Sequence, residues 1–575
     1  MKIGHFFYSI YNYVSFVNCI FVRQFINEAV NSQSNDMQKV IKYILFVFIS
    51  IGIHFSNFSQ VLYDYNDISI FFGDKIKSNT LIQSLEKTKS EELLCVQNKP
   101  SFFQVFSKNN SNQTFDFITD YTLPKSKPIK LYGEGEKTNL INYATLGDQI
   151  LALSYRATFL DQTPLFFYHN IDPNAISKVN HGFPISSFNG INRRMDLSQI
   201  SMISSKDQTL AAIVQIPNTR PDDYTTIKYF IIEEDFALIN ENEFIYPYPT
   251  KEYEPLDYFI LDKNHQLFLT GHFVKEKTES TWNNTHRYYK QVSITKITEN
   301  QLSFENFKSD GKFFIDVEAY PHKDGIIITG LYSSFIDGQV EGVFIATINE
   351  RGRLESNHFI PFSQELIGSI KRDNTNQAIN NVQSQTEYKK FNTIDFKRVE
   401  DGFIFTAEFN AMEYRYGGND VPGATNLIDT YYWSGDLIVC KIDNDGKLIW
   451  DRRIPKIQRS INDGGYYISS AIYCDSNKVN FFFNDNLSNY NENGNYSKDG
   501  EVPYFAQFNS SKNTIAHVSI QLSNGKVHRK KTIGKKETST LFVPRLSVAF
   551  TKNQKLMIYG QSGKKHRIGS VSFSE

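Results

Sequence analysis

Acidic residues that stand close together are the first candidates for chemistry in this sequence. Adjacent pairs such as Asp222-Asp223 and Glu233-Glu234 occur, but neighbouring residues on a β-strand point to opposite faces. Such pairs do not place a general acid and a general base on one surface. The run Asp443–Gly446 suggests calcium, yet the next three residues supply none of the oxygen ligands that a calcium loop needs. We therefore interpret this run as a hairpin turn, and we predict no catalytic residues, no metal site and no cofactor.

Aromatic residues are the second candidates, because Tyr and Trp rings stack on sugars or anchor a protein partner with little loss of rotamer entropy. They gather in three long connections, Val274–Lys290, Asn410–Ser434 and Asn486–Val502. Insertions within repeats often collect on a binding face. The same aromatic residues could simply pin the connections to the ends of a sheet, so both roles stay open. As ligand-binding residues we predict Trp282, Tyr288, Tyr289, Tyr414, Tyr416, Tyr431, Tyr432 and Trp433.

A short sequence motif that recurs along the chain must form the strands that position these residues. It is a polar turn with Asp or Asn, followed by a strand of apolar residues, and its clearest copies are His322–Gly330 and Glu400–Ala407. An outer hairpin follows each copy and is marked by Gly and Asn turns, as at Asn349–Leu354, because these residues tolerate positive φ. The turn residues recur at intervals of 57 to 60 residues and later of 76 to 77 residues. They are Asp148, Asp207, Asn264, Asp324, Asp401, Asn477 and Asn553.

Four-stranded units repeated in this way predict an all-β fold, a β-propeller of four-stranded blades. We favour eight blades, with a strand from Val61–Phe72 completing the last one, and seven blades with an N-terminal cap is the alternative. Closure of this kind removes the free edges that an open sheet would leave. Helical patterns are few, and the strongest is Asn79–Glu92.

The start of the chain predicts export. Lys39 and Lys42 precede the apolar run Tyr43–Ile53, which has the length of a signal-peptide core and is short for a membrane span. Ser59 fits a cleavage point. We divide the chain into residues 1–36, an over-extended gene start; 37–59, a signal peptide; and 60–575, the propeller. An uncleaved N-terminal anchor is the alternative for the first segment.

Composition and charge exclude several classes of protein. The 575 residues are 40% hydrophobic and 21% charged, which excludes a disordered chain and a polytopic membrane protein. A net charge of −1 leaves no basic excess for a phosphate backbone, so we expect no nucleic acid as partner. The four cysteines have no metal-ligand spacing. Free strand cysteines are favoured, and a Cys440–Cys474 disulfide stays open.

Two short segments resemble known families. Asp436–Trp450 resembles the repeats of secreted bacterial β-propeller proteins, in which an apolar strand runs into a Lys-ϕ-Asp-x-x-Gly-x-ϕ-x-Trp turn, and Ile345–Leu354 is a weaker match. This resemblance implies export and a propeller fold but no particular function. Arg453-Ile454-Pro455 resembles the Arg-Ile-Pro element of sialidases, but the Ser-x-Asp-x-Gly-x-x-Trp boxes of that family are missing.

These features predict an exported, non-enzymatic binding or scaffold protein that is periplasmic, on the cell surface or secreted. Its partner would be a glycan or an envelope protein, held by aromatic loops on one face of the propeller, and the mature chain would have no membrane span. Two alternatives stay open: a carbohydrate-active enzyme, glycosidase or lyase, that uses the central funnel, and a purely structural surface protein. Clustered carboxylates and arginines in the funnel would favour the enzyme, and exposed aromatic residues would favour the binding protein.

Overall fold

The sheets of this protein are built from antiparallel strands that follow one another in the sequence. The computed structural model describes residues 60–65, 68–72, 76–77, 84–91, 93–99, 102–109, 114–122, 138–156, 165–171, 182–186, 188, 199–217, 220, 222–261, 265–277, 287–298, 301–323, 325–335, 340–372, 386–416, 428–506, 508, 511–552 and 554–573. All of them belong to one unit, Ser59–Glu575. The predicted gene start and signal peptide, residues 1–59, lie outside the described residues.

Four sheets each contain four consecutive strands. The first has β4 (Ser84–Lys87), β5 (Leu93–Lys99), β6 (Phe102–Asn109) and β7 (Thr114–Thr122). The second has β8 (Thr138–Leu146), β9 (Gln149–Arg156), β10 (Leu165–Ile171) and β11 (Phe183–Ile185). The third has β12 (Ile200–Ser204), β13 (Leu210–Gln215), β14 (Tyr224–Glu233) and β15 (Leu238–Pro249). The fourth, near the C-terminus, has β29 (Ala471–Cys474), β30 (Lys478–Asn486), β31 (Asn513–Gln521) and β32 (Val527–Gly534).

Two further sheets lie between these in the sequence. One contains two four-stranded groups joined at Tyr289↔Phe314. The first group has β16 (Tyr253–Leu261), β17 (Gln266–Lys277), β18 (Arg287–Thr298) and β19 (Gln301–Lys308), and the second has β20 (Phe313–His322), β21 (Gly325–Ser333), β22 (Gly342–Ile348) and β23 (Leu354–Pro361). The other sheet has β24 (Thr386–Val399), β25 (Gly402–Tyr416), β26 (Ile428–Asp443), β27 (Leu448–Ile454) and β28 (Gln458–Ile461), with β27 and β28 both paired to β26.

The last sheet joins the two ends of the unit. Its C-terminal strands are β33 (Leu541–Phe542), β34 (Val548–Phe550), β35 (Lys555–Ser562) and β36 (Lys565–Phe573), and its N-terminal strands are β1 (Gln60–Tyr65), β2 (Ile68–Phe72) and β3 (Ile76–Lys77). Strand β2 pairs with β36 from Ile68↔Phe573 to Phe72↔Gly569. The described helices are short: α4 (Gln364–Arg372), α6 (Lys535–Thr538), η4 (Leu487–Asn489) and η5 (Pro544–Leu546).

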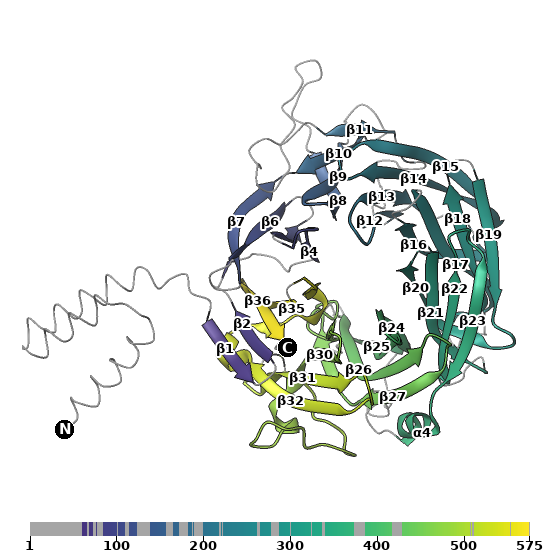
Figure 1. Cartoon of the computed structure of the whole chain (residues 1–575). Helices are drawn as coiled ribbons and strands as arrows, with labels where there is room; N and C mark the ends of the chain where they lie inside the picture. Colours follow the sequence, from purple (N-terminus) through teal and green to yellow (C-terminus); the bar gives the residue numbers. More distant parts are fainter. Residues whose placement is uncertain are drawn as a thin grey trace, which may run out of the picture. The chain divides into compact units, whose positions relative to one another are not determined.

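The middle strands of these groups explain why the groups stack. Every residue of β13 and of β21 is buried, as expected for strands covered on both faces. One apolar cluster joins β8–β10 to β12–β14, and others join each later group to the next, so that the groups lie around a ring (Figure 1). Stacked four-stranded antiparallel groups are the architecture of an all-β propeller, and this fold prediction is confirmed.

Contacts between residues far apart in sequence close the ring. Leu85 of β4 lies in one apolar cluster with strands β34–β36. The ammonium of Lys87 donates to the carbonyl oxygen of Ala549 at 2.7 Å, and the carboxylate of Glu91 accepts from the backbone N–H of Thr551 at 3.1 Å. The first and last groups are therefore neighbours, as the pairing of β2 with β36 requires.

The turns in the structure agree with those predicted from the repeated sequence motif. Asp148, Asp207, Asp401 and Asn477 all lie in turns or bends between the first and second strands of a group, and the other three turn residues lie outside the described residues. The run that begins at Asp443 is the hairpin turn between β26 and β27: the Asp443 carboxylate accepts from two backbone N–H groups, 2.9 and 2.8 Å away.

The motif tryptophan of the resemblance, Trp450, is a contact between neighbouring groups. Its indole N–H donates to the carbonyl oxygen of Leu522 at 3.0 Å, and Gly525, with φ of +68°, lies so close that a Cβ there would stand 2.9 Å from the ring. Glycine at this turn therefore provides both the backbone conformation and the space.

Two local predictions are wrong. The helical pattern Asn79–Glu92 contains strand β4, because pairing with β5 and burial of Leu85 outweigh helical periodicity. The connections around 274–290 and 410–434 are not loops throughout, because β17, β18, β25 and β26 extend into them as paired strands. Cys440 and Cys474 are free. In the described part of the chain, no helix is long and apolar enough to cross a membrane.

A buried histidine predicts a pH dependence of stability. His566 on β36 is completely buried, neither ring nitrogen has a hydrogen-bond partner among the described residues, and burial lowers its pKa from 6.5 to about 4. Because the unfolded chain binds this proton at higher pH than the folded chain, the free energy of unfolding should fall as the pH drops from 6.5 towards 4, by up to about 3 kcal/mol. Urea unfolding across this range should show a smaller loss for His566→Leu. The exposed His528 is the control: His528→Leu should keep the wild-type slope, and an unchanged slope in His566→Leu would contradict the assignment.

Candidate functional site

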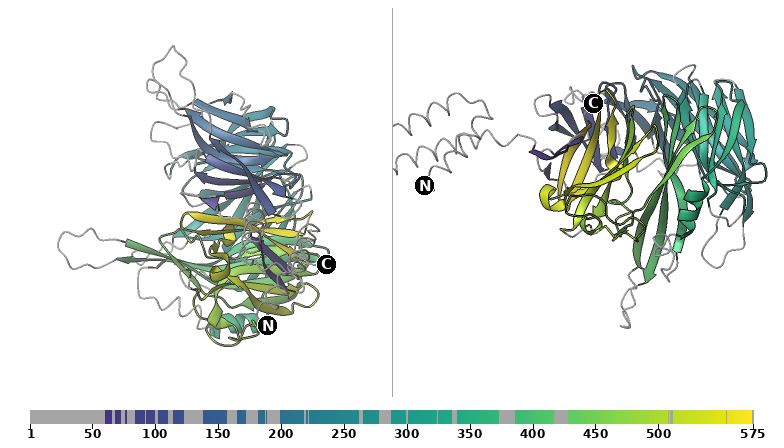
Figure 2. Two further views of the ribbon diagram at one scale, coloured as in Figure 1. Left: turned by 90° about the vertical axis from the view of Figure 1, so that its left-hand side faces the viewer. Right: turned by 60° about the horizontal axis from the view of Figure 1, so that its bottom comes forward.

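The hairpin formed by β25 and β26 is the part of the described chain where candidate binding residues meet. Its strands pair from Asn410↔Ser434 to Tyr416↔Ile428, beyond the segment where β27 covers β26 (Figure 2, green). Strand β28 pairs with this extension through Tyr431↔Ile461 and Trp433↔Arg459. Because directly opposite residues share a face, these four side chains lie on one side of the hairpin.

A segment of the neighbouring group completes this surface. The chain from β30 to β31 passes beside β28, where the backbone N–H of Ala506 donates to the carbonyl oxygen of Ile457 at 3.1 Å. The ring of Phe505 then packs against Trp433, with centroids 5.7 Å apart. We call Tyr431, Trp433, Arg459, Ile461 and Phe505 the arginine–aromatic face. Ile461 is 44% exposed and Phe505 is 40% exposed, whereas Trp433 is only 3% exposed.

Arg459 is the centre of this face. Its guanidinium carbon lies 5.6 Å from the ring centroid of Tyr431, 5.3 Å from Trp433 and 5.7 Å from Phe505. The residue is exposed, and in the part of the chain that the structure describes its guanidinium has no carboxylate partner and no hydrogen bond. Three aromatic rings thus hold a planar cation whose N–H donors are unused.

Buried charges underneath hold the hairpin to the rest of the sheet. The ammonium of Lys456, which is completely buried, lies 2.8 Å from the carboxylate of Glu408 and also donates to Ser434 and Gln458. Burial lowers the pKa of Lys456, while Glu408 opposes this shift. Since both charges are removed from water, each depends on the other.

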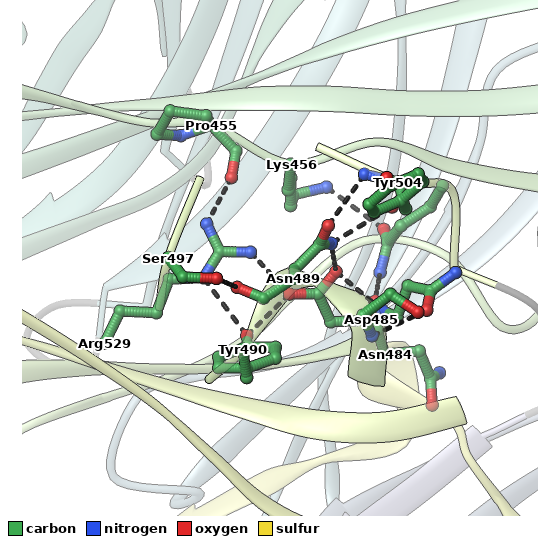
Figure 3. Close-up of polar contacts among 12 residues, drawn as sticks. Pro455, Lys456, Asn484, Asp485, Asn489, Tyr490, Ser497, Tyr504 and Arg529 are labelled. Atoms are coloured by element: carbon green, nitrogen blue, oxygen red, sulfur yellow. Dashed lines mark hydrogen bonds and ion pairs between the residues drawn. The ribbon is translucent and has the colours of Figure 1, made fainter. Parts of the chain in front are cut away.

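A second buried pair connects the next group (Figure 3). The guanidinium of Arg529 on β32 donates to the carboxylate of Asp485 and to the carbonyl oxygen of Pro455. Asp485 also accepts from the Tyr490 hydroxyl at 2.5 Å and from the Asn489 side chain at 2.8 Å. Burial raises the pKa of Tyr490 well above its ordinary value, so this phenol stays neutral and acts as a donor.

The network fixes the segment that carries Phe505. The Asn489 side chain both donates to the carbonyl oxygen of Tyr504, at 3.1 Å, and accepts from its backbone N–H, at 2.7 Å. Asp485 holds Asn489, and Asn489 therefore holds the chain at 504–505 against the hairpin. The carboxylates of Glu408 and Asp485 each pair with a buried cation, and the Asp485 network positions the chain at 504–505.

The structure separates the predicted site residues. Tyr431 and Trp433 share the arginine–aromatic face, whereas Tyr414 and Tyr432 belong to the opposite face of the hairpin, since strand side chains alternate. Trp433 is a core residue that donates its indole N–H to Glu413 at 3.2 Å, so it supports the face more than it presents surface. Trp282 and the side chains of Tyr288, Tyr289 and Tyr416 lie outside what the structure describes, and their binding role stays a prediction.

Arg459, Phe505 and the buried charges were missed by sequence analysis. A usable signal existed for Glu408, which interrupts the apolar run Phe403–Phe409: a carboxylate in a strand buried on both faces needs a partner. No local signal marks Arg459 or Phe505, because the face is assembled from segments that are distant in sequence.

The similarity of this protein to known proteins is weak. The sequence matches no protein-family model and no curated protein sequence. Among solved structures, the WD40 domain of SCAP from fission yeast is similar at a TM-score of 0.37 and 9% identity, over 87% of this chain and 93% of that chain. Oligogalacturonate lyase in complex with manganese is similar at a TM-score of 0.34 and 8% identity, over 87% of this chain and 99% of that chain. Because these scores are low, the propeller assignment depends on the strand topology above.

The buried pair gives a stability prediction. Glu408→Gln leaves the Lys456 ammonium buried without a carboxylate and should lower the free energy of unfolding by about 3–5 kcal/mol. Urea unfolding measures this loss, and the double variant Glu408→Gln with Lys456→Met should recover much of it. The control is Glu501→Gln, which removes an exposed partner of Lys498 and should change the free energy of unfolding far less, because water screens this pair. If Glu408→Gln and Glu501→Gln lowered the free energy of unfolding equally, burial would not be the reason for the loss.

Proposed function

We propose that this propeller is an exported binding protein of the cell envelope or exterior, and that it holds a glycan or protein partner at the arginine–aromatic face without transforming it. The observation that carries the proposal is Arg459, an exposed guanidinium that aromatic rings hold in place and that pairs with no carboxylate of the described residues. Arginine, tyrosine and tryptophan dominate the energetic centres of protein interfaces, and aromatic rings stack on sugars.

The shape of the hairpin supports this proposal. Its outer part is less covered than its inner part: the β26 residues from Ile428 to Tyr432 are exposed or partly buried, whereas those from Trp433 to Ile442 are buried. The buried network beneath gives the face a fixed geometry, which lowers the entropic cost of binding.

Binding is tested with a matched pair of tyrosines on one strand. A glycan array and a pull-down from envelope extract should each be run with the wild type, Tyr431→Ala and Tyr432→Ala. Loss of Tyr431 should weaken binding by about 2 kcal/mol or more, as for an interface hot spot, with little change in the melting temperature. Tyr432→Ala, on the opposite face, should bind as the wild type does.

Three results would contradict the proposal. Equal loss in both variants would move the site away from this face, and a collapse of the melting temperature in Tyr431→Ala would make this residue a structural anchor. Breakdown of a bound glycan would support the carbohydrate-active enzyme instead.

Export is a separate prediction, motivated by the Lys39–Ser59 pattern. Mass spectrometry of the protein isolated from its native cells should find a mature N-terminus close to Ser59. An intact Met1 or Met37 in a cytoplasmic fraction would contradict export, whereas an intact N-terminus in the membrane fraction would support the uncleaved anchor.

A further inference from the structure

We propose that the ligand of the arginine–aromatic face is an acidic polysaccharide whose sugars carry carboxylates. This inference rests on the proposed function and specifies its ligand class. It starts from the unused donors of Arg459, whose planar fork matches the two oxygens of a carboxylate. The neighbouring cation Arg415 does not offer such a fork, because its guanidinium already pairs with the carboxylate of Glu413.

The arrangement around Arg459 fits a sugar ring beside that carboxylate. Phe505, at 40% exposure, presents ring surface next to the guanidinium, whereas the partly exposed Tyr431 ring also has the Arg415 guanidinium carbon 4.4 Å from its centroid. A sugar acid has the same two features, a face of C–H groups and a carboxylate, on one rigid unit. Stacking and the charge-assisted hydrogen bonds can therefore form together, with little rotamer entropy lost.

A second cation–aromatic pair, Lys498 and Tyr504, comes just before Phe505 in the sequence. The Lys498 ammonium stands 5.1 Å from the ring centroid of Tyr504, which is 53% exposed. Its partner Glu501 is itself exposed at 65% of its side chain, so a ligand carboxylate can compete for Lys498. A polymer in which ring and carboxylate repeat offers one such unit to each of the two pairs, which a protein with a single acidic side chain does not.

The test uses defined probes and the full mature chain. Binding of polygalacturonate, alginate, methyl-esterified polygalacturonate, dextran sulfate and poly-L-glutamate is measured by calorimetry at low and high salt. Polygalacturonate or alginate should bind, and methyl esterification, which removes the charge but keeps the sugar, should weaken binding at least about tenfold. High salt should weaken binding of the free acids and not of the ester.

Substitutions of Arg459 test whether this residue recognises the ligand carboxylate. Arg459→Met should weaken polyuronate binding at least about tenfold and remove most of its salt dependence, while Arg459→Lys, which keeps the charge but loses the fork, should lie between. Because Arg459 is exposed, both variants should keep the wild-type melting temperature. The control Arg351→Met removes an exposed arginine in the turn between β22 and β23 and should bind as the wild type does.

Several outcomes overturn the inference. Equal binding of the free and esterified polymers, or wild-type affinity in Arg459→Met, shows that the carboxylate is not recognised at this residue. Arg459-dependent binding of dextran sulfate or poly-L-glutamate without polyuronate binding assigns a sulfated glycan or an acidic protein instead. If neutral glycans bind in a manner sensitive to Tyr431→Ala but not to Arg459→Met, the inference fails while the proposed function stands.

Discussion

The middle strands of each group impose the constraint on which the rest of the structure depends. Strands such as β13 and β21 are apolar on both faces, and each face must be covered by another sheet. A stack of such sheets would always leave one apolar face at each end. A ring removes both ends, and here β2 pairs with β36 while Lys87 and Glu91 contact the backbone at 549–551.

Because these strands are buried, a charged side chain within them needs an oppositely charged partner. Glu408 and Lys456 are withdrawn from water, as are Asp485 and Arg529, and each of these pairs is joined directly. Replacing such pairs with apolar residues often costs nothing, so their presence is weak evidence for added stability. Their effect on geometry is clearer: they tie β25, the start of β28, β30 and β32 together at the base of the hairpin, and through Asn489 they place the segment that carries Phe505.

Beyond this base the β25–β26 hairpin extends out of the ring. Side chains on this extension are no longer covered by a neighbouring group, so they need not be apolar. Cross-strand pairs and the backbone ladder with β28 hold this extension together, so its outer side chains can be exposed. Arg459 lies at the boundary between the buried base and the exposed extension of the hairpin. Trp433 beside it belongs to the core, while the guanidinium stays in water with no carboxylate among the residues that the structure describes. Rigid support below and an unused donor group above are the properties of a recognition site.

The sequence by itself determined the strand repeat, because the signals for it are local. An Asp or Asn turn followed by a continuous apolar run is readable within ten residues, and four of the predicted turn residues, Asp401 among them, lie between the first and second strands of a group. The sequence also placed Tyr431, Tyr432 and Trp433 among the candidates but could not separate them. Strand register decided that Tyr431 and Trp433 share a face with Arg459, since a slip of one residue would have presented Tyr432 instead. Phe505 and the partner of Glu408 come from other segments, and only the packing of one group against the next brought them together.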